Sequence, residues 1–436
     1  MDGPLILSIT RTAWSALAGV VTIYIIATHV TPSEQGFYYT FGNILALQVF
    51  VELGLNQVII QHASHEWAKL DLDNNGRIVG DRESRSRLVS FGRTACSWYL
   101  IAAGLGGVGI AIAGYIFFEA SPDHGVKWLE PWLLLCLLTS IKLAMQPLWS
   151  LLEGCNRVGE VFSYRLSVAI LSTITLLSFI ILGAGLWALP LSLVIDIAWS
   201  IIFLRLRCWN FILSFAVDIP GPRIDWKRDV LPIQLRMASS WVCGYFIFSL
   251  FTPVTFHYQG AVAAGQMGMT WGLVSAVSSV ASAWRATKAP MYGILIARKD
   301  YEALDKLHAR VLWITAWVAA MMAFFIWAAV YAMHMLNLTI MNRVLPPLPT
   351  GLFLLATVLI QIPSSQAAYL RAHKREPFMG ISIVQALLTG ICVTVLGRPF
   401  GPTGMAAAYL LIIALLVVPW GAAIWRRCAT DWHVVE

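Results

Sequence analysis

Cationic side chains lie inside long apolar stretches of this sequence, several of them on helical faces that also carry serine. The positions are Arg11, Lys142, Arg236, Arg285 and Lys288. Residues three, four or seven positions apart share a face of a helix, and the serines around Arg11 and Arg285 follow those steps. Arginine presents a planar fork of donors that matches phosphate oxygens, so these residues together could hold an anionic ligand.

Two carboxylates lie in similarly apolar surroundings. Glu52 has Gln48 and Asn56 one helical turn away on either side, and Asp196 lies near the middle of another apolar stretch. An ionised side chain at the centre of a bilayer costs about 2.5–3.5 kcal/mol on insertion scales, so such groups face water, a ligand or a charged partner. Either carboxylate could carry a coupling proton or cation, and a structural role is an equally good interpretation.

Two further interpretations of the charged residues stay open. Arg11, Arg236, Arg285 and Lys288 lie near the expected cytoplasmic ends of their stretches, so each could extend its side chain to the lipid headgroups. Lys142 lies too deep for that. With Glu52 it could instead form a buried ion pair.

Composition indicates the elements that position these residues. Apolar residues make up 58% of the 436 residues and charged residues only 12%, about half the charged share of a soluble domain. Stretch after stretch reaches the length of about 20 residues that crosses a bilayer as a helix, and none alternates as a membrane β-barrel strand would. We therefore expect an all-α polytopic membrane protein with about twelve spans. These are placed near 5–30, 37–63, 89–118, 131–153, 161–183, 186–206, 231–252, 262–289, 307–334, 350–370, 378–396 and 402–425.

The positions of lysine and arginine predict the orientation of the chain. They concentrate in alternate loops, and only Lys127, Arg343 and Arg398 fall in the others. The positive-inside rule then places both termini in the cytoplasm. The longest inside loops, 66–88 and 207–230, are charged and are expected to be solvated connectors. No loop is large enough for a soluble catalytic domain, so an enzyme is not expected.

A weak internal repeat relates the two halves. Arg11-x3-Ser15-x3-Gly19 matches Arg236-x3-Ser240-x3-Gly244, and Pro147, Glu160 and Phe162 match Pro363, Glu376 and Phe378. Transporters are often built from such repeats, although coincidence among common residues is the alternative.

The repeat predicts two pseudo-symmetric six-helix lobes around a central cavity. The first lobe is expected at 1–208 and the second at 231–427, with a cytoplasmic linker at 209–230 and a tail at 428–436. Arg11 and Arg236 would then lie on opposite walls of one cleft.

Several other signals carry little weight. The seven cysteines are scattered with no disulfide or metal spacing, so no metal or other cofactor is expected. Gly104-Leu-Gly-Gly-Val-Gly109 lies mid-span without a preceding strand, which argues against nucleotide binding. The net charge of +7 is explained by the cytoplasmic loops, and no nucleic-acid partner is expected.

Two segments resemble a known family. The stretch from Thr31-Pro-Ser-Glu-Gln-Gly-Phe-Tyr to Phe50-Val-Glu-Leu-Gly-Leu55, and Phe256-His-Tyr-Gln-Gly260 followed by Ala264-Gly-Gln-Met-Gly-Met-Thr-Trp271, resemble bacterial O-antigen-type polysaccharide flippases. These belong to the multidrug/oligosaccharidyl-lipid/polysaccharide exporter superfamily. The resemblance implies two lobes around a cavity, alternating access, and an undecaprenyl-diphosphate-linked oligosaccharide moved from the inner to the outer leaflet of the bacterial cytoplasmic membrane.

The resemblance also bears on individual residues and partners. Cavity arginines on the first helix of each lobe in the related lipid II flippase match Arg11 and Arg236. The first-helix carboxylate typical of drug exporters is absent, which weakens but keeps the alternative of a multidrug-type small-molecule antiporter. A membrane glycan polymerase or ligase is a third possibility, although such enzymes generally need a larger outside loop. Ion coupling, membrane lipids and polysaccharide assembly proteins as partners follow from the family alone.

Overall fold

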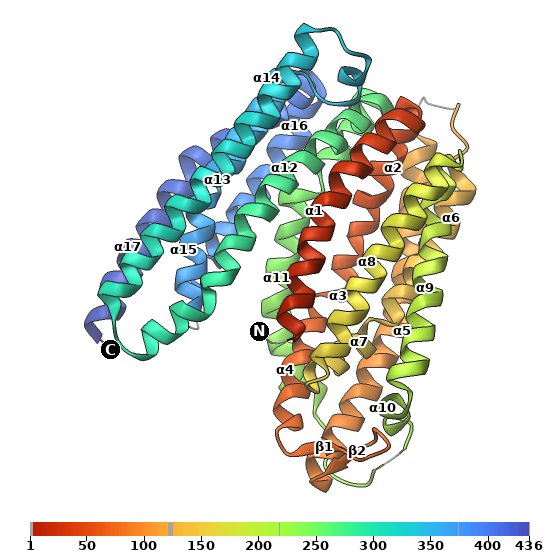
Figure 1. The fold of residues 1–436 in the computed structure, drawn as a ribbon, viewed down its shortest axis with the longest axis vertical. Helices are drawn as coiled ribbons and strands as arrows, with labels where there is room; N and C mark the ends of the chain where they lie inside the picture. The colour runs from red at the N-terminus through yellow and green to blue at the C-terminus, as the bar shows by residue number, and fades with distance from the viewer. Residues whose placement is uncertain (1–2, 121–124, 218, 374, 436) are drawn as a thin grey trace. The chain divides into compact units, whose positions relative to one another are not determined.

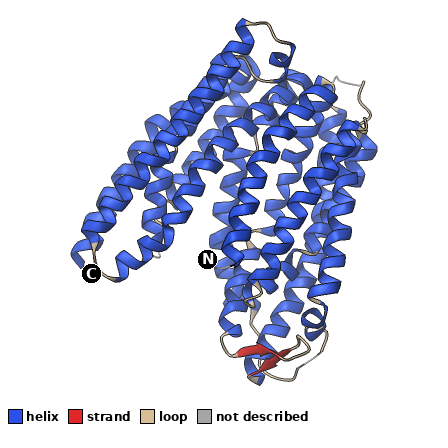
Figure 2. Cartoon of the chain, viewed as in Figure 1, coloured by secondary structure: helices blue, strands red, loops and turns tan. Residues whose placement is uncertain are grey.

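The computed structural model describes residues 3–120, 125–217, 219–373 and 375–435, and in these it is almost entirely helical (Figure 2). The longer helices are α1 (Gly3–His29), α2 (Pro32–Leu45), α4 (Leu55–Trp67), α5 (Arg82–Glu119), α6 (Leu129–Ala144), α8 (Val158–Ile181), α9 (Ala188–Arg207), α11 (Leu231–Phe248), α12 (Phe251–Ala297), α13 (Tyr301–Met335), α14 (Pro347–Leu359), α15 (Gln361–Ala372), α16 (Met379–Ile412) and α17 (Val418–Val435). Short helical elements are η1 (Ala46–Gln48), α3 (Val49–Glu52), α7 (Gln146–Gly154), η2 (Gly185–Trp187), α10 (Trp209–Ser214), η3 (Trp226–Val230), η4 (Thr339–Arg343) and η5 (Ile413–Val417). Strands β1 (Leu70–Leu72) and β2 (Ile78–Gly80) form one antiparallel hairpin.

Nine helical segments within the described residues are long and apolar enough to cross a membrane, or ten if the bent pair Pro32–Glu52 and Leu55–Trp67 is one span. Two of the nine are too long for one crossing, at 72 and 54 residues. A straight helix of that length would measure about 110 or 80 Å, against an apolar layer of about 30 Å.

Both long segments contain a glycine with backbone angles that no helix has. Gly260 lies at φ 84°, ψ 177° in α12, and Gly401 at φ 56°, ψ −148° in α16. Glycine adopts positive φ without a steric penalty, which allows a sharp turn. The side chain of Gln259 donates to the carbonyl of Gly397 at 3.2 Å, so the two turns lie close together. Dividing each segment at its glycine separates the spans where the sequence predicts loops.

Three predicted spans are broken rather than continuous. The second bends by 45° between Glu52 and Leu55, where Leu53 and Gly54 are both left-handed. The fourth is divided into α6 and α7 at Met145, and the tenth into α14 and α15 at Ile360. Proline lacks a donor and clashes with the preceding turn, which explains breaks just before Pro147 and Pro363.

Tertiary contacts divide the chain into two compact units. Unit 1 comprises residues 1–30 and 44–242, and unit 2 comprises residues 31–43 and 243–436. The lobes expected from sequence do not coincide with these units, because 31–43 packs with the second half and 231–242 with the first. Grouping by contacts does not test pseudo-symmetry, so the lobe boundaries stay a prediction.

Unit 1 is a bundle in which α8 packs between α1 and α9, while α5 and α9 both pack against α6 (Figure 1). Its core is apolar and aromatic and includes the fully buried Leu55, Val58 and Leu152. Large apolar side chains such as Leu17 and Leu105 remain 69% and 73% exposed. Exposed leucines along whole helices are what a lipid-facing surface requires.

Unit 2 is built on α12, which packs against α13, α15 and α16, while α15 also packs against α17. One core cluster includes Phe251, Phe353 and Tyr409. The segment of α2 in this unit contacts α12 very closely: a Cβ added to Gly36 would lie 1.9 Å from the carbonyl oxygen of Ala261. Only glycine fits at that position.

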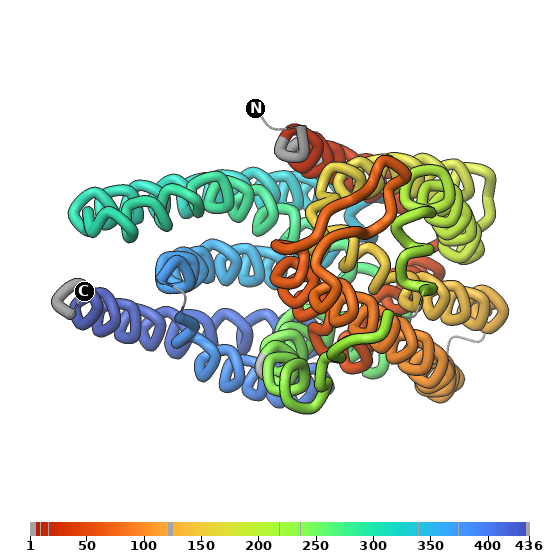
Figure 3. The backbone as a smooth tube through the Cα atoms, turned by 90° about the horizontal axis from the view of Figure 1, so that it is seen from below, coloured from red at the N-terminus to blue at the C-terminus, as the bar shows by residue number. Residues whose placement is uncertain are grey.

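The two long inside loops are folded rather than solvated, which corrects the expectation from sequence. Asn210 on α10 donates to the carbonyl of Asn75 at 2.7 Å, and the hydroxyl of Ser214 accepts from the amide of Ile78 at 3.1 Å. Figure 3 shows the hairpin beside the segment that contains α10. The charges in these loops concealed apolar anchors such as Leu70, Ile78 and Phe211, which join the core of unit 1.

Candidate functional site

Arg285 is the cation with the clearest unusual environment. Its guanidinium Nη1 donates to the side-chain oxygen of Gln361 at 2.8 Å, where α14 gives way to α15. Arg285 is half-buried and Gln361 is 2% exposed. No carboxylate pairs with Arg285 among the described residues. A partly buried arginine whose only partner is neutral has no counter-ion in the protein, so its positive charge can pair with an anionic ligand.

Lys288 extends the same region of α12. Its ammonium lies 5.3 Å from the centre of the Trp284 ring, a cation–π contact. Such a contact leaves the donors of the ammonium available, because the ring interacts through its face. Arg285 and Lys288 therefore place two positive charges one helical turn apart, as the sequence predicts.

Lys142 is not an independent cation. Its ammonium lies 3.3 Å from Oδ2 of Asp196, which joins α6 to α9 within unit 1. The alternative of a Lys142–Glu52 pair is wrong, because periodicity along one helix could not show which of two distant carboxylates would lie nearer. The remaining oxygen of Asp196, Oδ1, is buried without a hydrogen-bond partner among the described residues.

Glu52 belongs to a separate polar network in unit 1. Asn56 donates to its carboxylate at 3.0 Å, and the oxygen of the Asn56 amide accepts from Tyr99 at 2.5 Å and from Ser150 at 3.3 Å. Tyr99 and Ser150 are buried. Sequence reasoning found Glu52 and Asn56 through their four-residue spacing, but it missed Tyr99 and Ser150 because they come from other helices.

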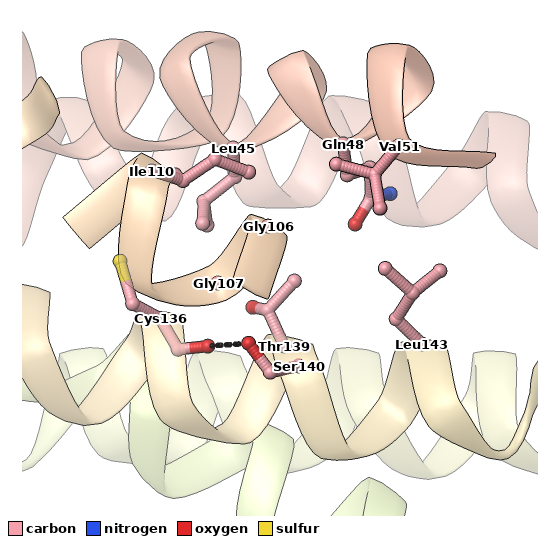
Figure 4. Close-up of a pocket in the computed structure, with 10 residues that line it drawn as sticks. All are labelled: Leu45, Gln48, Val51, Gly106, Gly107, Ile110, Cys136, Thr139, Ser140 and Leu143. Carbon is pink, nitrogen blue, oxygen red and sulfur yellow. Dashed lines mark hydrogen bonds between the residues drawn. The ribbon is translucent and has the colours of Figure 1, made fainter. Parts of the chain in front are cut away.

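A small cavity lies in the same unit, and Gln48 and Val51, just before Glu52 in the sequence, are among the residues that line it. The volume of the cavity is about 10 Å³, which is about the room that one water molecule needs. The amide of Gln48 and the hydroxyl of Thr139 are turned toward it (Figure 4), whereas Ser140 donates to the carbonyl of Cys136 at 2.9 Å. Apolar side chains supply most of the remaining lining, so the cavity is too small and too apolar for a lipid headgroup.

The two first-helix arginines give a less complete result. Arg11 lies on α1, is exposed and has no ion-pair partner among the described residues. Arg236 lies on α11, but its side chain is outside the described residues. Both positions belong to unit 1. A common cleft for Arg11 and Arg236 stays a prediction.

Metal binding has no evident site in the described part of the chain. No group of three histidine, cysteine, aspartate or glutamate side chains has an arrangement that could hold a metal ion there. What the described residues offer is two cations of unit 2, Arg285 and Lys288, without a carboxylate partner among those residues, and the Lys142–Asp196 pair in unit 1.

Comparison with known proteins gives a consistent fold. The sequence matches no protein-family model and no curated protein. Among solved structures, the chain is similar to an inward-facing multidrug resistance MATE transporter of the MOP superfamily, with a TM-score of 0.66 and 14% identity over 99% of both chains. It is also similar to the lipid II flippase MurJ in an inward closed conformation, with a TM-score of 0.58 and 15% identity over 97% of this chain and 87% of that one.

A third similar structure is a MOP superfamily transporter from Pyrococcus furiosus, described as having a binding pocket of reverse polarity. The TM-score is 0.56 and the identity 13%, over 97% of this chain and 95% of that one. Identities this low establish the fold alone. The chain is a multi-pass α-helical membrane protein with the fold of the MOP superfamily transporters.

Proposed function

We propose that this protein flips an undecaprenyl-diphosphate-linked oligosaccharide from the inner to the outer leaflet of a bacterial cytoplasmic membrane by alternating access. The observation that carries the proposal is the environment of Arg285, a half-buried guanidinium whose partner is the neutral amide of Gln361. A diphosphate headgroup would supply the missing negative charge. It would also accept bidentate hydrogen bonds from arginine.

Other residues extend this binding role. Lys288 adds a second cation one turn along α12. In unit 1, Arg11, Arg236 and Lys142 stay candidate substrate-binding residues, as predicted from the sequence. Glu52 and Asp196 are the candidate coupling carboxylates. The likeness in fold to a lipid II flippase supports a lipid-linked ligand, and the pattern of lysine and arginine supports cytoplasmic termini.

The alternative is a multidrug-type antiporter, which likeness to MATE transporters supports. A site that binds cationic drugs would need negatively charged side chains. Unit 2 instead offers the positively charged Arg285 and Lys288. Increased resistance to cationic drugs on overexpression would favour this alternative over the flippase.

A cellular experiment tests the proposal. Arg285→Gln and Lys288→Gln are introduced together into a bacterial host that depends on this protein for its surface glycan, and the lipid-linked glycan is assigned to one leaflet or the other. We expect it to accumulate in the inner leaflet. Lys306→Gln is the matched control, because Lys306 is exposed and pairs with Glu302 on its own helix. Normal delivery to the outer leaflet by the double variant would contradict the proposal.

A further inference from the structure

The ion pair between Lys142 and Asp196 is unevenly buried. The side chain of Lys142 is 46% exposed, whereas that of Asp196 is only 6% exposed. Their contact is a single one, at 3.3 Å from the ammonium to Oδ2, and Oδ1 of Asp196 is buried with no hydrogen-bond partner among the described residues. A fixed structural ion pair inside a protein normally satisfies both oxygens, because buried unpaired polar atoms are costly.

Among the described residues, Lys142 is the one cation that pairs with Asp196. From α8, the hydroxyl of Tyr164 pairs with that of Ser200, and Ser200 in turn donates to the main-chain oxygen of Asp196 at 2.8 Å. From α6, Lys142 is the facing cation. Lys142 is thus the charged group that acts on Asp196, Tyr164 is a titratable group beside it, and the hydroxyl of Ser172 on α8 also faces its carboxylate. Loss of the Lys142 contact would therefore leave the buried carboxylate without a counter-ion.

We propose that Lys142 exchanges between two partners, the carboxylate of Asp196 and a phosphate oxygen of the ligand, and that Asp196 takes up a proton when Lys142 leaves. This deepens the proposed function and rests on it, since the ligand is taken to be a lipid diphosphate. The bond from the ammonium to Oδ2 is replaced by one to the phosphate, and a proton from water binds the carboxylate. The pair thereby links binding of the anionic headgroup to binding of one proton.

The linkage has a definite sign. Protonation of Asp196 frees Lys142, so a lower pH favours binding of the diphosphate, and by reciprocity the diphosphate favours protonation. Removing the charge of Asp196 has the same effect as protonating it. Asp196→Asn is thus expected to bind the diphosphate more tightly at neutral pH and to lose the part of the pH dependence that Asp196 causes.

The test uses the full chain in lipid nanodiscs and undecaprenyl diphosphate as the probe. Affinity is measured at pH 6 and pH 8 for the wild type, Asp196→Asn, Lys142→Gln and the double variant, which keeps the pair neutral if a single variant fails to fold. Glu153→Gln is the control, because it breaks the neighbouring Arg165–Glu153 pair in the same unit. We expect Asp196→Asn to bind about tenfold more tightly than the wild type at pH 8, within the usual range of coupling between two sites. Lys142→Gln and the double variant should bind weakly, and Glu153→Gln should match the wild type.

An infrared measurement provides a readout that needs no ligand. In Lys142→Gln the buried Asp196 lacks its counter-ion. Its protonated carboxyl should therefore give a carbonyl band without ligand, isolated by subtracting the spectrum of the double variant so that other carboxyls such as Glu52 cancel. In the wild type this Asp196 band, taken as the difference from Asp196→Asn, should appear only when undecaprenyl diphosphate is added. A merely structural ion pair would give no such band on ligand addition.

The outcomes separate the exchange from the proposed function. If the wild type binds undecaprenyl diphosphate and Asp196→Asn keeps both its affinity and its pH dependence, the exchange is wrong and the flippase proposal stands. If the infrared band is absent from Lys142→Gln, the exchange is also wrong. If the wild type binds no undecaprenyl diphosphate at either pH, the proposed ligand is wrong and the exchange falls with it.

Discussion

Arg285 on α12 contacts Gln361 at the break between α14 and α15, with 2.8 Å between the guanidinium nitrogen and the amide oxygen. The break matters because Gln361 is the first residue of α15, and Ile360 alone separates it from the end of α14 at Leu359. An amide at this position orients the guanidinium without neutralising it. The pair therefore presents an oriented positive charge, which is what recognition of a phosphate requires.

Gln361→Glu tests whether that charge must stay uncompensated. The substitution conserves size and places a carboxylate against Arg285, and a hydrogen bond between charged groups contributes about 1.5–3 kcal/mol. We expect transport to fall by about ten- to a hundredfold, since the ligand must now compete with an internal anion. Transport is measured as the rate of glycan delivery to the outer leaflet. Gln361→Leu, which removes the hydrogen bond but keeps the charge, should be less severe, and the opposite order would contradict this account.

Gly36→Ala tests the close crossing of α2 and α12. The added methyl group would lie 1.9 Å from the carbonyl oxygen of Ala261, so the helices must separate. Overpacking of this kind costs about 1–3 kcal/mol, and the melting temperature of the purified protein should fall. Gly42→Ala is the matched control on the same helix, because nothing lies within 4 Å of its added methyl group. That variant should be neutral or more stable, as alanine favours helix more than glycine does.

The sequence predicts much of the fold, because bilayer thickness imposes a length and a composition on every span. It also predicts turns near Gly260 and Gly401, where two adjacent spans must be separated. It does not predict the folded cytoplasmic hairpin, since Leu70 and Ile78 are too few and too closely surrounded by charge to give a periodic signal. Nor could it pair Lys142 with Asp196, because periodicity orders residues along one helix and says nothing about which helices are neighbours.

Asp81→Ala tests the cap of α5 and its dependence on pH. The carboxylate of Asp81 accepts from the amide of Ser84 at 2.9 Å, and this bond lowers the pKa of Asp81 below its usual value. A lowered pKa contributes stability above the unfolded-state value of about 3.9, and that contribution is lost as the pH falls through the folded-state value. The melting temperature of Asp81→Ala should lie below that of the wild type at pH 7, and the gap should close in acid. Asp81→Asn retains a cap and should show a smaller gap at pH 7, so an equal loss in both variants would argue against capping.

Arg93→Gln tests whether the segment between the two halves is anchored to unit 1. Arg93 donates to the carbonyls of Phe215 at 2.6 Å and Ala216 at 2.5 Å, directly after α10. Glutamine cannot reach both, so the segment should open more often. We expect faster hydrogen exchange and faster proteolysis across 209–217. Lys227→Gln, at an exposed position in the predicted linker 209–230, should leave both rates unchanged. Equal protection of 209–217 in the two variants would show that Arg93 is not the anchor.

Reconstituted flipping tests the central claim most directly. The protein is placed in proteoliposomes with a fluorescent undecaprenyl-diphosphate-linked oligosaccharide, and movement between leaflets is followed with a quencher that cannot cross the bilayer. We predict that the wild type flips the lipid, that the double variant Arg285→Gln/Lys288→Gln slows it by about tenfold or more, and that Lys306→Gln keeps the wild-type rate. Flipping at the wild-type rate by the double variant would contradict a cationic headgroup site on α12.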